Sequence, residues 1–245
     1  MRRILLTIKY KGTAYNGWQR QNNAVSIQSI VEEAIFAITQ ERVTIQASGR
    51  TDTGVHAIGQ TAHFDTEYDI SPSRLIAALN AKLPKDISIN GAKEVAPDFH
   101  ARYSAISKTY LYRLYVDRID DVFFDNLRHR IYYSLDMDAI NSAAKHLIGK
   151  HDFASFAASG SSVKTTVRTI TDITIDINGN EIDIRITADG FLYNMVRIII
   201  AMLLKVGCGK ILPDDIPKII AVKDRRYTQS VAPACGLYLS EVRYQ

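Results

Sequence analysis

The chain has 245 residues, of which 47% are hydrophobic and 23% charged, and it contains two cysteines. This composition is typical of a globular protein with a sizeable core, and it excludes an intrinsically disordered chain and a disulfide-rich secreted domain. The formal net charge of +4 permits a polyanionic partner such as RNA without requiring one.

The sequence predicts neither a secretory leader nor a membrane span. The first residues, Met-Arg-Arg-Ile-Leu, lack the long apolar region of a signal peptide. The most apolar run, Met195 to Val206, contains two cations, and it is shorter than the roughly 20 residues that a membrane helix needs. Cys208 and Cys235 have neither the spacing nor the flanking histidines of a zinc site. We therefore expect a cytoplasmic protein without a membrane anchor or a bound metal.

The first part of the chain predicts the order strand, helix, strand, strand, helix, strand. Apolar and polar residues alternate from Ile4 to Tyr10, which is the pattern of a strand with one buried face. Ser26 precedes apolar residues at helical spacing, and Ser71-Pro72 is a typical start for a second helix. The remaining strands are predicted at Val43 to Ser48, at Val55 to Phe64 and around Ile87, Ile89 and Val95.

A second unit is predicted to begin near Phe99. Its elements are a strand from Lys108 to Tyr115, a helix from Asp136 that ends at Gly149, a hairpin, an apolar helix that ends at Gly207, and a closing strand from Ala232 to Leu239. In the hairpin, Ile173, Ile175 and Ile177 face Ile182, Ile184 and Ile186 across the turn Asn178-Gly179. The pattern predicts an α+β fold with helices on one face of mainly antiparallel sheets, divided into residues 1–98 and 99–245.

The segment from Ala47 to Gly59 is the first candidate for chemistry. It presents Arg50 and Asp52 on a loop between two predicted strands, where folds commonly place functional residues. Gly49 and Gly54 leave its backbone free to approach a ligand closely. The alternative is that Asp-Thr-Gly is only a hairpin turn, because aspartate and glycine are ordinary turn residues.

The loop from Lys11 to Gln21 is the second candidate. It combines Lys11 and Arg20 with aromatic residues, including the single tryptophan, Trp18. Cations beside aromatic rings suit RNA, because phosphates attract the former and bases stack on the latter. The alternative is that Trp18 simply fills the core.

The nine residues from Gly49 to Ala57, GRTDTGVHA, resemble the signature loop of the TruA family of tRNA pseudouridine synthases. The Lys11 to Gln21 loop also resembles a motif of this family, and so do three later strings. These strings run from Phe99 to Tyr115, from Asp189 to Arg197 and from Ala232 to Leu239. The resemblance therefore covers nearly the whole chain, and it implies two α+β halves whose sheets join, with the active-site cleft between the halves.

The resemblance also implies roles for individual residues. Asp52 matches the catalytic aspartate, the expected nucleophile, and Arg197 matches an arginine that faces it; Arg50 lies in the same signature loop. Tyr110 matches a tyrosine that stacks on the substrate, and Leu237 matches a residue that lines the uridine pocket. From the residues alone, Arg197 could instead extend to solvent, and Tyr110 could be a buried strand aromatic.

The implied reaction is the isomerisation of uridine to pseudouridine in the tRNA anticodon stem-loop, at tRNA positions 38, 39 and 40, by a homodimer. It needs no redox change and no group donor, so we expect no cofactor. One ionised carboxylate kept charged by arginines would serve this chemistry. Asp52 could attack the ribose, attack the base or abstract a sugar proton. The candidates for phosphate contacts are Lys11, Arg20, Arg102 and Arg168.

Two other classes of function remain open from the residues. A glycosidase or nucleosidase would also cleave a glycosidic bond, but it commonly uses two carboxylates and the signature loop supplies one. A non-catalytic RNA-binding module would carry aromatic residues on its sheet surface and would not depend on the charge of Asp52. Release of free uracil would identify the former, and indifference to Asp52→Asn the latter.

Overall fold

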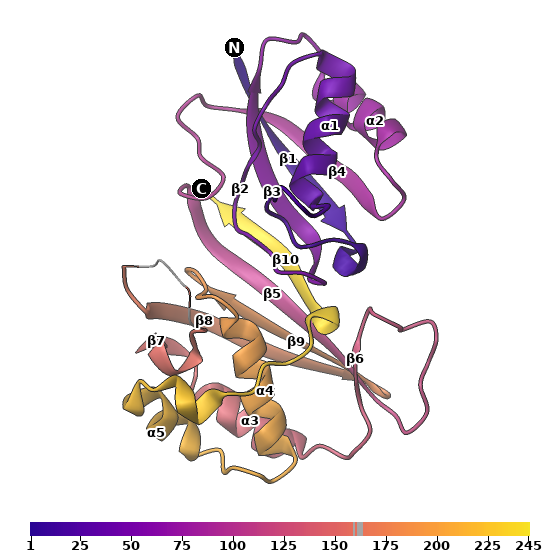
Figure 1. The fold of residues 1–245 in the computed structure, drawn as a ribbon. Coiled ribbons are helices and arrows are strands. Elements are labelled where there is room, and N and C mark those ends of the chain that lie inside the picture. The colour runs from indigo at the N-terminus through magenta and orange to yellow at the C-terminus, as the bar shows by residue number, and fades with distance from the viewer. Residues whose placement is uncertain (159, 161–163) are drawn as a thin grey trace. The chain divides into compact units, whose positions relative to one another are not determined.

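The structure, a computed structural model, describes residues 1–158, 160 and 164–245. The chain forms two compact units, which are Met1–Ile106 with Tyr238–Gln245, and Ser107–Leu237 (Figure 1). The predicted division after residue 98 differs from these units in residues 99–106 and 238–245. The last residues group with the first unit because the C-terminal strand β10 (Leu237–Tyr244) pairs with β3 (His56–Thr66).

The first unit is an α+β structure whose strands follow the order β4-β1-β3-β10, with the short β2 paired to β3. All of these pairs are antiparallel except β10 with β3, which is parallel. Figure 1 shows both helices on the same side of this sheet. The other elements are β1 (Arg2–Tyr10), α1 (Ile27–Thr39), β2 (Gln46–Ala47), α2 (Pro72–Lys82) and β4 (Ile87–Val95).

A local sequence signal sets the start of α1 as predicted. The Ser26 side chain accepts a hydrogen bond from the backbone N–H of Ser29, and the Ser29 side chain accepts one from the backbone N–H of Ser26. This reciprocal capping satisfies two donors that the first turn of a helix leaves unpaired. The apolar face of α1 then buries Ile27, Val31 and Ile35 completely in the core.

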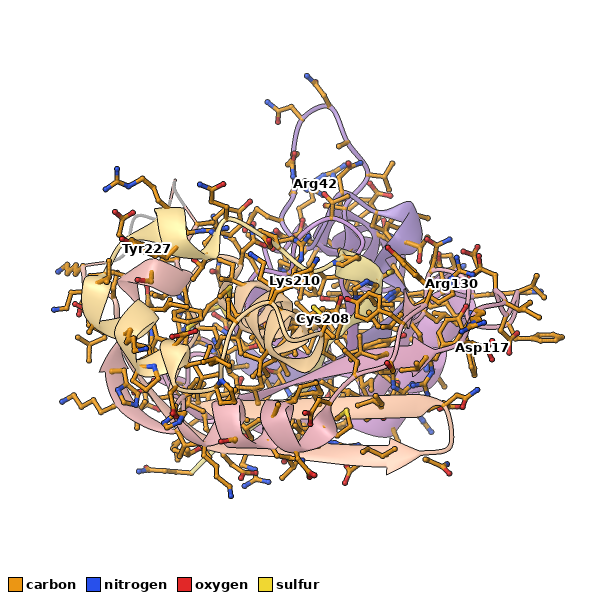
Figure 2. All side chains as sticks on the ribbon, turned by 90° about the horizontal axis from the view of Figure 1, so that it is seen from below. Arg42, Asp117, Arg130, Cys208, Lys210 and Tyr227 are labelled. Atoms are coloured by element: carbon orange, nitrogen blue, oxygen red, sulfur yellow. The ribbon has the colours of Figure 1, made fainter. Side chains whose placement is uncertain are left out.

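The strand predicted from Val43 to Ser48 is wrong in extent, because only Gln46 and Ala47 are in a strand. The backbone N–H of Ile45 donates to the carboxylate of Glu32 on α1, at 3.0 Å, and is therefore not available to a neighbouring strand. Arg42, labelled in Figure 2, places its guanidinium 4.4 Å from the centre of the Phe36 ring on the same helix. Contacts with α1 thus replace most of the predicted strand pairing.

The second unit has the strand order β5-β9-β8-β7, with β6 parallel to β5. Its three α-helices lie on one side of this sheet in Figure 1. The strands are β5 (Ala105–Val116), β6 (His129–Ile131), β7 (Gly149–Asp152), β8 (Val167–Asn178) and β9 (Glu181–Ala188). The helices are α3 (Met137–Lys145), α4 (Met195–Gly207) and α5 (Asp215–Val222).

The predicted hairpin is confirmed in register. Its three isoleucine pairs are Ile173 with Ile186, Ile175 with Ile184 and Ile177 with Ile182. The turn lies one residue later than predicted, because Asn178 still pairs with Glu181. Gly179, at φ +59°, and Asn180 therefore form the two-residue loop.

Two further element boundaries differ from the sequence prediction. Helix α3 ends at Lys145, and Gly149, at φ +113°, begins strand β7 instead of closing the helix. The segment Ala234–Gly236 forms a 3-10 turn, so the closing strand begins only at Leu237. The α+β class and the helix and strand types are otherwise confirmed. Within the described residues, no helix is long and apolar enough to cross a membrane.

Candidate active site

The loop that carries Asp52 is held by the N-terminal loop of the same unit. The backbone N–H of Trp18 donates to the carbonyl of Thr51 at 2.9 Å, and the hydroxyls of Tyr10 and Thr51 lie 2.7 Å apart. Val55 N–H closes the turn on the carbonyl of Asp52 at 3.1 Å. The hydroxyl and the carbonyl of Thr51 and the carbonyl of Asp52 therefore all form hydrogen bonds. Asp52 itself is half-buried.

Two glycines allow this close contact between backbones. A Cβ on Gly17, whose φ is +77°, would lie 2.5 Å from the Thr51 carbonyl oxygen and 3.1 Å from the carbonyl carbon of Asp52. A Cβ on Gly12 would lie 1.9 Å from the carbonyl oxygen of Val55. No other residue type fits either position without displacing the loop. In the sequence, these glycines indicate only a loop, and they do not identify the Asp52 loop as its partner.

Gln60 supports the start of the same loop from strand β3, and it was not singled out from the sequence. Its buried side chain accepts a hydrogen bond from the Ser48 hydroxyl at 2.7 Å and donates one to the Gly49 carbonyl at 2.9 Å. A buried glutamine must satisfy both ends of its amide. Here it does so by fixing the backbone just before Arg50.

His56 supports the end of the loop. Its fully buried ring accepts a hydrogen bond at Nδ1 from the backbone N–H of Gly12, at 3.0 Å. Because Nδ1 accepts, the N–H of this ring is on Nε2. The ring also stacks on Tyr238 of β10, with 4.6 Å between ring centres. His56 lies within the signature string, but its spacing alone does not reveal this supporting contact.

Trp18 fills the core, as the structural alternative predicted, because only 1% of its surface is exposed. Tyr10 is also buried, and burial raises the pKa of its hydroxyl well above the ordinary value. The hydroxyl is therefore protonated at neutral pH and can hydrogen-bond to Thr51. These aromatic residues of the N-terminal region position the loop instead of presenting a surface to RNA.

The basic residues predicted in the first unit differ in their surroundings. Arg50 and Lys11 are exposed. Arg20 forms an ion pair of 3.0 Å with Glu32, a carboxylate that is almost completely buried. Arg102 is exposed and lies 5.7 Å from the centre of the Tyr103 ring. Arg20 is thus committed in part to neutralising a buried charge, whereas the other three extend to solvent.

The second unit contains the remaining predicted residues. Tyr110, on β5, is half-buried and meets the ring of Phe191 edge to face, with 5.1 Å between ring centres. Leu237 is buried, with 6% of its surface exposed. Arg168 donates to the carbonyls of Thr165 and Val167. The contact with Phe191 brings together two of the strings that carry the family resemblance.

Arg197 joins two further strings at the start of α4. Its Nε donates to the carbonyl of Ala232 at 2.7 Å, and its Nη1 donates to the side chain of Asn194 at 2.9 Å. The backbone N–H of Ala232 returns a hydrogen bond to the Arg197 carbonyl. The guanidinium is therefore partly buried and does not simply extend to solvent. Its pairing with Asp52 stays a prediction.

The side chains that could bind a metal ion do not gather anywhere in the described part of the chain. Within residues 1–158, 160 and 164–245, no group of histidine, cysteine, aspartate or glutamate side chains is arranged to hold a metal ion. Both cysteines are free thiols, and Cys208 follows the last residue of α4 (Figure 2). The backbone carbonyls of Thr51 and Asp52 are both hydrogen-bonded, so the backbone that carries the Asp52 carboxylate is held in place.

Comparison with known proteins gives matches along the chain. A family model described as tRNA pseudouridine synthase matches residues 6–104 and 143–245. The tRNA pseudouridine synthase A of Acetivibrio thermocellus is 47% identical over 247 residues, and tRNA pseudouridine synthase A 2 of Clostridium perfringens is 48% identical over 244 residues. Each match covers 100% of both chains.

A solved archaeal box H/ACA sRNP Nop10-Cbf5 complex contains a chain that is 12% identical, with a TM-score of 0.37 over 82% of this chain and 43% of that chain. This similarity is too weak to support a conclusion. The family model and the full-length relatives suffice, because they match both the Asp52 loop and the strings around Arg197 and Leu237. The chain belongs to the tRNA pseudouridine synthase family, a family of isomerases.

Proposed function

We propose that this protein converts uridine to pseudouridine in tRNA and that Asp52 is the carboxylate that performs the chemistry. The observation that carries the proposal is the fixed backbone around Asp52, which Gly17 and Trp18 of the N-terminal loop contact directly, while His56 binds Gly12 of the same loop. A charged group that only closed a turn would not need such support. Membership of the family supports the same reaction.

The reaction breaks the glycosidic bond between C1′ of the ribose and N1 of uracil, and it forms a carbon-carbon bond between C1′ and C5. The proton on C5 is lost and N1 gains one, so the product is an isomer of the substrate. No oxidant, reductant or group donor takes part. Asp52 acts as the nucleophile while the base is detached, and its fixed orientation reduces the entropy lost in reaching the transition state.

The remaining parts of the proposal concern how the substrate is held. Tyr110 stacks on the target base and Leu237 lines its pocket, while Arg197 and Arg50 keep Asp52 ionised. The target base must leave its stack to reach such a pocket, and stacking on an aromatic ring offsets this cost. We place the target in the anticodon stem-loop, at tRNA positions 38, 39 and 40. We also propose a homodimer that works in the cytoplasm.

Phosphate contacts complete this part of the proposal. The candidates are Lys11, Arg20, Arg102 and Arg168. Lys11 and Arg102 are the stronger candidates, because both are exposed and neither forms an ion pair within the described part of the chain. Arg20 neutralises Glu32, and Arg168 donates to nearby backbone carbonyls.

The test is Asp52→Asn, which removes the charge and keeps the size of the side chain. We expect no detectable pseudouridine in an anticodon-arm transcript, with little change in affinity for the RNA. Asp69→Asn is the matched control, because this carboxylate is fully exposed, and we expect it to react like the wild type. Product formation by purified Asp52→Asn would contradict the proposed role.

The same reaction mixtures test the hydrolase alternative. An isomerase keeps uracil bound until the new bond forms, so free uracil should stay below detection while pseudouridine accumulates. Uracil released in proportion to uridine lost, without pseudouridine, would mean that the protein cleaves the glycosidic bond by hydrolysis.

A further inference from the structure

Tyr103 presents an unusually bare aromatic ring in the first unit, with 77% of its surface exposed. It lies in the turn from Phe99 to Ser104 that leads into strand β5. The ring of His100 packs against it, with 4.4 Å between ring centres and 37° between their planes. One side of the tyrosine is therefore supported while most of its ring stays open to solvent.

The turn that carries Tyr103 is closed by hydrogen bonds between its own residues. The backbone N–H of Ser104 donates to the carbonyl of His100 at 2.8 Å, and the backbone N–H of His100 donates to the Ser104 hydroxyl at 3.0 Å. Nδ1 of His100 also accepts from the backbone N–H of Arg102 at 3.1 Å. These bonds close the turn on itself, so the exposed ring has little backbone freedom to lose on binding a ligand.

The turn is also anchored to the sheet through Ala101, which is completely buried. Its N–H donates to Nδ1 of His63 on β3 at 3.2 Å, and its carbonyl accepts from the Tyr244 hydroxyl on β10 at 2.8 Å. Burial, together with the neighbouring charge of Arg3, lowers the pKa of His63, which favours the neutral ring that can accept this bond. Side chains of strands β3 and β10 thus fix the turn through the backbone of Ala101.

The guanidinium of Arg102 lies near the exposed ring of Tyr103. The guanidinium carbon of Arg102 lies 5.7 Å from the centre of the Tyr103 ring, and no carboxylate pairs with Arg102 among the residues that the structure describes. Phe123 is similarly exposed, at 83%, but Asp121 and Asp125 lie beside it in the chain and would repel phosphate. Tyr103 therefore combines the two features that single-stranded RNA selects, which are a stacking surface and a positive charge.

We propose that Tyr103 and Arg102 form a nucleotide-binding site, in which a tRNA base stacks on the open face of the tyrosine and Arg102 contacts a phosphate. This inference rests on the proposed function and adds a second contact to it. His63, which binds the Tyr103 turn, lies seven residues along β3 from His56, which lies at the end of the Asp52 loop. At roughly 3.3 Å per residue, the two histidines are about 23 Å apart. The bound nucleotide is therefore not the target uridine beside Asp52.

The experiment measures the affinity of the full-length protein for a tRNA transcript by filter binding, together with single-turnover rates at saturating RNA. Tyr103→Ala should weaken binding by about 5- to 150-fold, which is the range for the loss of one stacked base. Tyr103→Phe should bind like the wild type, because stacking needs only the ring. The single-turnover rate at saturation should be unchanged in both variants, because neither side chain touches the reacting atoms.

The salt dependence of tRNA affinity tests the role of Arg102 independently. Arg102→Gln should lower the slope of log affinity against log salt concentration by about 0.7 to 0.9, which corresponds to one lost phosphate contact. Tyr68→Ala is the matched control, because this tyrosine is 40% exposed but is flanked by Glu67 and Asp69. We expect its affinity and salt slope to match those of the wild type.

Three outcomes would overturn the inference. Wild-type affinity in Tyr103→Ala would mean that no base stacks there, while the proposed function would stand if the wild type binds and modifies tRNA. An equal loss of affinity in Tyr68→Ala would show an effect that is not specific to the site. If Tyr103→Ala changed the sedimentation coefficient of the protein and left its tRNA affinity unchanged, Tyr103 would belong to a protein interface instead.

Discussion

Replacing Gly17 by alanine tests whether the N-terminal loop positions Asp52. The new Cβ would lie 2.5 Å from the Thr51 carbonyl oxygen, whereas real contacts are at least 3.0 Å and ordinary ones begin at 3.4 Å, so the two backbones would have to separate by 3.0 − 2.5 = 0.5 Å at least and by 3.4 − 2.5 = 0.9 Å to reach ordinary contact. All of its nearest atoms belong to the backbone of residues 51–53, so no side chain can rotate out of the way. The displacement must therefore be taken up by the Asp52 loop, by the N-terminal loop or by both.

Two effects of Gly17→Ala have different magnitudes. Placing alanine at φ +77° costs about 1 to 2 kcal/mol of folding stability. A displacement of nearly 1 Å at a reacting group costs on the order of 10²-fold in rate. We therefore expect a moderate loss of stability in urea unfolding and a fall of about 10²-fold in the single-turnover rate of pseudouridine formation.

Gly209→Ala is the control for this experiment. Gly209 has a similar φ of +72°, and no heavy atom lies within 4 Å of the position that its Cβ would take. It should therefore lose similar stability and keep wild-type activity. If Gly17→Ala reacted within about threefold of the wild type while showing the same loss of stability as Gly209→Ala, the N-terminal loop would have no positioning role.

Two further predictions concern the second unit. Tyr110→Phe should keep its edge-to-face contact with Phe191 and bind tRNA almost normally, but single-turnover product formation should be slow if the hydroxyl transfers a proton; Tyr110→Ala should lose both affinity and rate. Wild-type behaviour of the alanine variant would make Tyr110 an ordinary strand residue. Burial lowers the pKa of His129 to about 4, so unfolding binds a proton between this value and the unfolded value of about 6.5. The contribution of His129 to folding stability is then complete above pH 6.5 and decreases as the pH falls toward 4, by at most about 3 kcal/mol before solvent screening. The free energy of unfolding of His129→Leu, measured in urea, should therefore depend less on pH than that of the wild type. An unchanged pH dependence would contradict this cause.

The sequence by itself determined the elements whose signals are local. The register of the β8–β9 hairpin followed from alternating isoleucines on both sides of a turn, because a slip by one residue would reverse the faces of the strand. The start of α1 followed from Ser26, because a capping side chain acts on the N–H groups of its own first turn. The resemblance of the Asp52 loop to a family signature rested on nine consecutive residues, Gly49 to Ala57.

Only the tertiary structure decided what holds that loop. Gly17 and Trp18 lie more than thirty positions before Thr51 in the chain, and no periodicity in either segment indicates that their backbones touch. The same holds for Ile45, whose N–H binds Glu32 of a neighbouring helix and thereby shortens a predicted strand. The parallel pairing of Tyr238 with His56 joins the last strand to the signature loop across most of the chain. Such contacts depend on which distant segments the folded core brings together, and a local pattern of residue types does not contain that information.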